Sequence, residues 1–414
     1  MDTCYNRGRM PPRIAGLALL LMAAVTPAAA QPAATPLTLA DALTRAREAA
    51  PALAAVRARI EGARAARLRA GRPLNPLVEL RSENWASRAP GGLPLDVFAT
   101  VTQTVELGGK RGARRGVAEA GVNSAAATET LIWREIARAV TADYLSALRA
   151  RDQARALATH AESLAEATRV MGRRVAVGSA PEAELLKLRT EEARAVVDRT
   201  RAELAAARAL ATLGAALGAD VTADALQRPV VPAVPADAAL AASHPELLAA
   251  ATAVDSARAT LALERARGVP DVAVNAGVKR TSGFNTGVAA VTVPIPLFDR
   301  NGVARALADG QVRAAEQERE ATERRLRGVL AASRAAATTL SGRAAEAHQL
   351  LVDPARGARD AARAAFAAGA MDVLRLLDAE RVFIDAALVT LELEIDAVAA
   401  VIEARLAAGE EPLP

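Results

Sequence analysis

The chain carries one series of landmarks twice, and this duplication constrains the fold more than any other feature of the sequence. The paired landmarks are Pro51 with Pro245, Pro76 with Pro270, Gly112 with Gly302, and Gly178 with Gly369. The proline pairs are separated by 194 residues (245 − 51 and 270 − 76), and the glycine pairs by 190 and 191. A nearly constant period indicates a duplicated structural unit. Each unit is predicted to contain a helix, two strands, a very long helix, a tip and a further helix.

Two long stretches with almost no proline predict helices far longer than those of compact domains. Residues 112–177 contain no proline, and residues 302–368 contain only Pro354, which should kink the second helix. At 1.5 Å per residue, each helix would be about 100 Å long. Helical patterns well beyond about 25 residues are typical of coiled coils.

Shorter helices are predicted on either side of each long one. Their ranges are 38–71 and 237–268, with bends at Pro51 and Pro245, and 182–217 and 372–406. In the last helix, apolar residues are spaced alternately by four and three positions: Ile384, Leu388, Leu391, Ile395, Val398 and Ile402. This heptad pattern favours knobs-into-holes packing, although an amphipathic helix of any bundle would also produce it. The chain is 52% hydrophobic but only 2% aromatic because alanine is abundant, which suits closely packed helices.

Four segments alternate apolar and polar residues, which indicates half-buried strands. They are Leu77–Trp85, Asp96–Glu106, Val272–Lys279 and Thr286–Ile295. The linkers at 88–92 and 281–285 are rich in turn residues. Four aromatic residues lie in or beside the hairpins: Trp85, Phe98, Phe284 and Phe298. Membrane barrels concentrate aromatic residues at both lipid interfaces, so these four are candidate interface residues; a soluble sheet packed on the helices is the alternative.

The first 30 residues predict a secretory signal peptide. Three arginines precede an uncharged apolar run at 14–25, and three alanines at 28–30 form a small-residue cleavage site. The only cysteine, Cys4, lies in this segment, so the mature chain would contain no disulfide. The chain is predicted to consist of the signal at 1–30, a first repeat at 31–217, a linker at 218–236, a second repeat at 237–408 and a flexible tail at 409–414.

The composition argues against several classes of function. The formal net charge is +5 with both signs interspersed, and no basic stripe with aromatic residues predicts nucleic-acid binding. The three histidines, His160, His244 and His348, lack neighbours at metal-ligand spacing. No nucleophile lies near a base in the sequence. The chain is therefore predicted to be no enzyme and to hold no metal or other cofactor, and His244 is interpreted as structural because it precedes Pro245 at a helix start.

Two junctions between a hairpin and its long helix carry a resemblance to a known family. They are the segments Glu106–Arg111 and Pro294–Asn301. Together with the ordered, duplicated elements, they resemble the TolC-like outer-membrane efflux proteins, in particular the subgroup of cobalt-zinc-cadmium resistance systems. Four residues are candidate strand-to-helix junctions: Gly108, Gly109, Pro294 and Pro296. Glycine allows unusual backbone angles and proline ends a strand, although an ordinary turn would use the same residues.

The resemblance implies both an architecture and a function. Three identical chains of four strands each would close a 12-stranded barrel in the lipid of the outer membrane, with a long periplasmic tube of helices. This homotrimer would passively conduct substrates from an inner-membrane RND-type pump and its periplasmic adaptor to the exterior. Divalent heavy-metal cations are the expected substrates, and a multidrug conduit for organic compounds is a second hypothesis. A soluble periplasmic coiled-coil scaffold or adaptor is a third hypothesis, and a stand-alone porin is a fourth.

The resemblance also assigns roles to two tips and one constriction. The residues expected to meet the adaptor are Val177, Gly178, Ser179, Gly369, Ala370 and Met371; Ser179 and Ala370 depart from the residues that the family often has there. Counting from the tip glycines places the pore constriction of the family at Glu184, Arg375 and Asp378. Three copies of Asp378 would attract cations to the mouth, or Arg375 would pair with Asp378 one turn away and hold it shut. Ordinary solvated surface charge would give the same residues.

Overall fold

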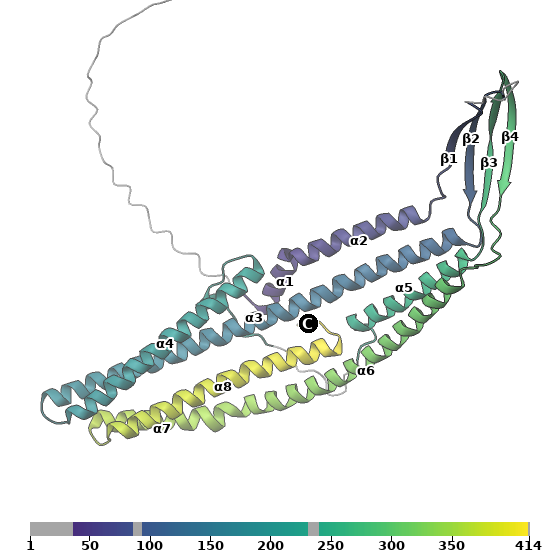
Figure 1. Ribbon diagram of the computed structural model, residues 1–414. Coiled ribbons are helices and arrows are strands. Elements are labelled where there is room, and N and C mark those ends of the chain that lie inside the picture. The colour runs from purple at the N-terminus through teal and green to yellow at the C-terminus, as the bar shows by residue number, and fades with distance from the viewer. Residues whose placement is uncertain (1–35, 86–92, 231–239, 413–414) are drawn as a thin grey trace, which may run out of the picture. The chain divides into compact units, whose positions relative to one another are not determined.

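The computed structural model describes residues 36–85, 93–230 and 240–412 of the chain. The predicted signal peptide at 1–30 and the predicted turn at 88–92 lie outside these residues. The described part consists of helices that pack side by side and one small antiparallel sheet (Figure 1). The predicted fold class, mainly helical with a small β part, is confirmed.

Within the described residues, the first repeat forms the helices α1 (Leu39–Ala49), α2 (Pro51–Ala70), α3 (Lys110–Ala176) and α4 (Glu182–Leu217). Thr38 begins α1 with a capping box, because its hydroxyl accepts a bond from the Asp41 N–H while Asp41 accepts one from the Thr38 N–H. Ala50 leaves the helical region, with ψ 113°, and Pro51 starts α2 at a position that needs no N–H donor. Instead of the predicted bend at Pro51, the chain forms two separate helices, α1 and α2, on either side of Ala50. As predicted, α3 is one uninterrupted helix, of 67 residues.

The second repeat forms α5 (Pro245–Arg267), α6 (Gly302–Ala347), α7 (Asp353–Ala368) and α8 (Val373–Ala408). The predicted helix over 237–268 is wrong in its first part, because residues 240–244 form a turn and α5 starts at Pro245. The Nδ1 atom of His244 accepts a hydrogen bond from the Glu246 N–H at 3.2 Å and so caps α5. His244 is 1% exposed, which confirms its interpretation as a structural residue.

The second long helix is interrupted between α6 and α7 by one π turn, His348–Val352. Pro354 follows in the first turn of α7. In an unbroken α-helix its missing N–H would remove a hydrogen bond, and its ring would clash with the preceding turn. The wider π turn accommodates the proline, so the predicted kink takes the form of a local change in helix type.

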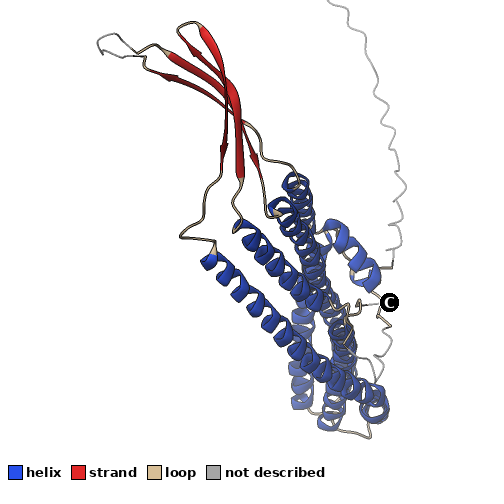
Figure 2. Cartoon of the chain, turned by 90° about the vertical axis from the view of Figure 1, so that its right-hand side faces the viewer, coloured by secondary structure: helices blue, strands red, loops and turns tan. Residues whose placement is uncertain are grey.

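The sheet contains β1 (Leu77–Glu83), β2 (Asp96–Val105), β3 (Val272–Thr281) and β4 (Phe284–Thr292) in this order, with all neighbours antiparallel. β2 and β3 pair along their whole length, so the hairpins of the two repeats form one sheet (Figure 2). Ser282 and Gly283 alone join β3 to β4, with φ angles of 50° and 91°. The predicted turn at 281–285 is therefore a two-residue hairpin turn, shorter than expected.

Register divides the side chains of the sheet between an apolar face and a polar face. The apolar face includes the valines Val78, Val97, Val101, Val274, Val278 and Val291. Much of it is exposed in the single chain; Leu80, for example, is 77% exposed. The polar face carries threonines and the charged residues Glu79, Arg81, Glu83, Asp96 and Lys279. A sheet with an exposed apolar face and unpaired edges at β1 and β4 needs a covering surface.

The helices enclose two main apolar cores. One lies where α1, α3, α4 and α8 meet and contains Tyr144, whose hydroxyl donates to the Leu37 carbonyl at 2.7 Å. The other lies among α3, α4, α7 and α8 near the tips and contains Met171 and Phe366. The predicted heptad seam of α8 is confirmed, because its residues face these helices. Buried are Ile384, Leu391, Ile395 and Ile402, and half-buried are Leu388 and Val398.

The described parts of the linker and the tail are held against the helices. The Leu37 N–H donates to the Ala225 carbonyl at 2.8 Å, which fixes the linker beside α1. At the other end of the chain, the Glu410 N–H donates to the Arg405 carbonyl at 3.0 Å. The indole of Trp133 also donates to Glu411, at 3.4 Å. Contacts with the helices therefore reach into the segment predicted as a flexible tail.

Candidate conduit surfaces

The first strand-to-helix junction requires glycine for two reasons. Gly108 and Gly109 have φ angles of 65° and 75°, in the left-handed region that side chains disfavour. A Cβ atom on Gly108 would also lie 2.6 Å from the Cβ atom of Val269, in the other repeat. Asp271 holds the two repeats together here, because it forms an ion pair of 2.7 Å with Lys110 at the start of α3.

The second junction presents apolar side chains outward. Pro294 and Pro296 lie between β4 and α6 in a segment without regular structure. The neighbouring Ile295 and Leu297 are 75% and 74% exposed, and Phe298, one of the predicted interface aromatics, is fully exposed. An exposed apolar segment beside an exposed apolar sheet is typical of a surface that contacts lipid or another chain.

The other three predicted interface aromatics lie toward the end of the sheet farthest from the helices. Trp85 and Phe284 are 80% and 77% exposed. Register places both Phe284 and Phe98 on the polar face, and Phe98 is half-buried there between two cations. The charged groups of Arg81 and Lys279 lie 4.5 and 5.2 Å from its ring centroid. These cation–π contacts hold Phe98 on the polar face, which argues against a position at the lipid interface.

The two tips close with the same hydrogen-bond pattern. In each, the glycine N–H bonds the carbonyl three residues back, and the next N–H bonds the carbonyl five residues back. The pairs are Gly178 with Val175, Ser179 with Arg174, Gly369 with Phe366, and Ala370 with Ala365, at 3.0, 2.8, 3.0 and 2.9 Å. Both glycines have positive φ, 73° and 81°, as this type of helix end requires.

Arg174, in the last turn of α3, ties the first tip to the second. Its guanidinium donates to the carbonyls of Phe366 and Ala367 at 2.5 and 3.0 Å and lies 5.1 Å from the Phe366 ring centroid. These carbonyls end α7, where a helix leaves acceptors unsatisfied and favours a positive charge. The tips thus form one connected surface, on which Val177 is 78% exposed and Met371 half-buried.

A buried carboxylate lies behind the tips, at the meeting point of α3, α7 and α8. Glu380 is 2% exposed and forms a two-pronged ion pair with Arg363, with distances of 2.5 and 3.1 Å. The Ser163 hydroxyl donates to it at 2.9 Å, and His160 lies 3.7 Å away. Burial alone would raise the pKa of Glu380, but the contacts with His160, Arg363 and Ser163 outweigh it and lower the pKa to about 2. Glu380 is therefore charged at any physiological pH.

The predicted constriction residues lie close to the tips. Glu184 is half-buried in the first turn of α4, and Arg375 and Asp378 are exposed on α8. The expected pair of Arg375 with Asp378 does not form within the described chain. Arg375 lies 3.6 Å from Asp372 instead, because the Asp372 side chain caps α8 by accepting the Arg375 N–H at 2.9 Å. Asp378 is thus available to face other chains or solvent.

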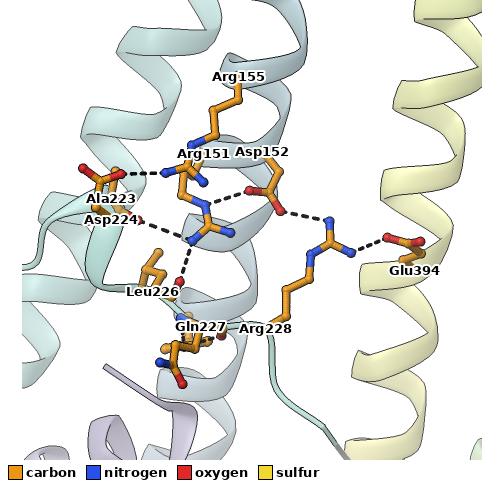
Figure 3. A network of polar contacts seen from close by, with 10 residues as sticks. Arg151, Asp152, Arg155, Ala223, Asp224, Leu226, Gln227, Arg228 and Glu394 are labelled. Carbon is orange, nitrogen blue, oxygen red and sulfur yellow. Dashed lines mark hydrogen bonds and ion pairs between the residues drawn. The ribbon is translucent and has the colours of Figure 1, made fainter. Parts of the chain in front are cut away.

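A polar network fastens the linker between the two repeats (Figure 3). Arg151 on α3 donates to the Leu226 carbonyl at 2.6 Å and to Asp152 at 2.7 Å. Arg228 of the linker bridges Asp152, at 3.0 Å, to Glu394 on α8. Glu394 in turn contacts the ring of His348 in the π turn at 2.8 Å. One chain of charges therefore connects the first long helix, the linker and the interruption of the second long helix.

Two kinds of feature are absent from the described residues. No group of three or more histidine, cysteine or acidic side chains in these ranges could hold a metal ion. No helix among them combines the length and the apolar composition that crossing a membrane requires.

Comparison with known proteins identifies the family. The model of the outer membrane efflux protein family matches residues 42–219 and 238–410, nearly all of the described chain. The chain belongs to the outer membrane efflux protein family. The two matched segments correspond to the two repeats of the chain.

Two relatives of this outer membrane efflux protein come from Cupriavidus metallidurans. The cobalt-zinc-cadmium resistance protein CzcC is 31% identical over 68% of the chain and 69% of its own length. The nickel and cobalt resistance protein CnrC is 34% identical over 70% of both chains. The outer membrane protein VceC of Vibrio cholerae has the same fold, with a TM-score of 0.75 and 17% identity over 90% of this chain and 96% of that one.

Sequence reasoning missed the buried Glu380 cluster and the linker network of this efflux protein. A signal for Glu380 was present, because it lies one helical turn before Ile384 and so continues the apolar stripe of α8. A charged residue in such a stripe needs a partner. Its partners could not be found in the same way, since Ser163 lies 217 residues away in the sequence.

Proposed function

We propose that this outer membrane efflux protein is the exit conduit for divalent heavy-metal cations, working with a periplasmic adaptor and an inner-membrane pump. The observation that carries the proposal is the similarity to CzcC and CnrC, which are named for resistance to cobalt, zinc, cadmium and nickel. A third relative, from Alcaligenes xylosoxydans xylosoxydans, is 33% identical and named for nickel, cobalt and cadmium resistance. A conduit needs no ligand site for the ions that pass through it.

The sheet supports assembly into a homotrimer. Its edges, β1 and β4, are unpaired within the chain, and a lipid-embedded sheet must close so that every edge finds a partner. Four strands are too few to close a barrel, whereas three copies of the 4-stranded sheet would supply 12 strands. The exposed apolar face would then contact lipid and the polar face would line the lumen. Phe298 and Trp85 would lie at the level of the membrane interfaces, whereas register places Phe284, opposite Thr281, on the polar face.

The tips support docking of an adaptor. Val177, Gly178 and Ser179 form an exposed reversal, and Arg174 connects it to the second reversal at Gly369–Met371. A partner would therefore meet both hairpins of a chain as one rigid unit. The pore-facing role of Glu184, Arg375 and Asp378 belongs to the same proposal, because all three lie within two turns of these tips.

The function is tested by expressing the full chain with its pump and adaptor in a Gram-negative host that lacks its own outer-membrane conduits. We expect higher tolerance to cobalt, zinc, cadmium and nickel, and lower cellular content of these metals. Val177→Asp should abolish this gain because it places a charge at the docking tip. Val230→Asp is the matched control, since Val230 is 92% exposed but lies in the linker. Tolerance gained only toward organic compounds would overturn the metal assignment.

Assembly is tested separately by membrane fractionation and gel electrophoresis. The chain should band with the outer membrane, and its unheated form should migrate in SDS as a trimer that heating converts to a monomer. Recovery of a monomer from the soluble periplasmic fraction would contradict the barrel.

A further inference from the structure

The polar face of the sheet carries five charged side chains per chain, and four of them are neutralised in pairs. Arg81 lies 3.3 Å from Glu83, and Lys279 lies 2.8 Å from Asp96. Thr281 also donates to Asp96, which is 7% exposed. These contacts and the Phe98 ring between the two cations fix both pairs against the wall of the sheet.

Glu79 is the fifth charge, and it has no cationic partner among the residues that the structure describes. It is exposed and lies opposite Thr100, which in turn lies opposite Gly277. No side chain fits at Gly277, because a Cβ atom there would lie 2.2 Å from the Ala99 carbonyl oxygen. The two residues beside Glu79 across the sheet, Thr100 and Gly277, therefore provide neither a cation nor a bulky group that could cover the carboxylate.

Assembly into a barrel would not supply a partner either. In a barrel closed by copies of this chain, β1 lies beside β4 of the next copy. On the polar face, β4 presents only uncharged residues: Phe284, Thr286, Val288, Ala290 and Thr292. Among the described residues of such a barrel, the carboxylate of Glu79 therefore stays unpaired on the lumen side of the wall.

We propose that Glu79 is a selectivity residue of the conduit: three copies form a ring of unpaired carboxylates inside the barrel and favour the passage of cations. The inference rests on the proposed conduit function and deepens it, because it assigns charge selection to the barrel and not only to the periplasmic tips. Acidic rings raise the local concentration of cations and exclude anions, and the effect weakens as salt screens the charges.

The test measures the potential at zero current across planar lipid bilayers that contain the purified full-length trimer in a potassium chloride gradient. Glu79→Gln should lower the ratio of potassium to chloride permeability about two- to threefold at 0.1 M salt, where the screening length is about 10 Å. Arg81→Gln should raise the ratio, because it releases the carboxylate of Glu83. Arg280→Gln is the matched control, since Arg280 lies opposite Val97 on the apolar face, near the level of Arg81. It should leave the ratio unchanged.

The possible failures are distinguishable. A Glu79→Gln channel that conducts with an unchanged permeability ratio would overturn the selectivity role and leave the conduit intact. A wild-type protein that forms no channel would overturn the conduit, and the selectivity role with it. An equal change in Arg280→Gln would also count against the inference, because the effect would then not depend on the polar face.

Discussion

The first long helix, α3, continues for 67 residues without a break, whereas the second consists of α6, a π turn and α7. The break accompanies Pro354, which has no counterpart in α3. A cavity of about 320 Å³ lies between α6 and α8 and is lined in part by Glu394, which also contacts His348 of the π turn. The two repeats thus share one order of elements, but the long helix of the second repeat is interrupted where that of the first is continuous.

The helix starts differ in the same way. Ala50 precedes α2 and provides no side-chain cap, whereas His244, at the equivalent position 194 residues later, caps α5 with its ring nitrogen. The hairpins behind the tips differ too. Arg363 forms an ion pair with the buried Glu380, but the positions 191 residues earlier hold Gly172 and Arg189, of which Arg189 is exposed. The two repeats therefore share a backbone plan but differ in the polar contacts that stabilise it.

The largest loss of stability should come from placing a proline in the first long helix, as in the second. Glu162→Pro, at an exposed position in the C-terminal half of α3, should destabilise that helix by about 3 kcal/mol or more, because α3 has no π turn to accommodate the ring. Glu162→Ala is the control and should change stability by less than about 0.5 kcal/mol. Pro354→Ala should also have an effect below about 1 kcal/mol. Amide hydrogen exchange along α3 and α7 measures all three, and equal effects at both sites would contradict the comparison.

A smaller loss of stability is expected when the ion pair between Arg363 and the buried Glu380 is broken. Glu380→Gln should make the amides of α7 open more easily by about 2–3 kcal/mol, since it leaves Arg363 partly buried without its counter-charge. Arg189→Gln, at the equivalent position of the first repeat, should have almost no effect. The folded-state pKa of about 2 lies below the ordinary value of 4.5, so the stabilisation is complete above pH 4.5 and is lost as the pH falls toward 2. Hydrogen exchange of α7 that is unchanged between pH 5 and pH 3 would contradict this assignment.

The smallest loss of stability is expected when His244, which caps α5, is replaced. Burial, and then the charge of Arg134, lower the pKa of His244, so the neutral ring accepts the Glu246 N–H. Because the folded-state pKa is below the ordinary value of 6.5, stability is complete above pH 6.5 and falls as the pH drops below it. His244→Ala should cost about 1 kcal/mol at pH 7.5, whereas His244→Asn keeps a capping acceptor and removes the pH dependence. Exchange of the first amides of α5 as a function of pH measures both; a pH dependence retained in His244→Asn would exclude this ring as its source.

Sequence reasoning located most elements because their signals are local. The apolar spacing of α8, the alternation of the four strands and the glycines at the tips each depend on neighbouring residues, and each led to the correct type of element. The start of α5 was predicted too early, since a cap such as His244 depends on side-chain geometry. The pairing of Arg375 with Asp378, one of the alternatives for the constriction, does not form within the described chain for a similar reason: Asp372 is also within reach and is already held in place as the cap of α8.

The sequence by itself determined the duplicated order of elements, the lengths of the helices and the faces of the strands, because periodicity and helix-breaking residues act within a few positions of each other. Only the tertiary structure decided that β2 pairs with β3 across the two repeats, that Arg81 and Lys279 lie against the Phe98 ring, and that Glu380 is charged inside the helical bundle. These outcomes depend on contacts between segments far apart in the chain, as between Ser163 and Glu380. Such contacts have no local signature, since the partner is fixed only when the helices and strands have packed.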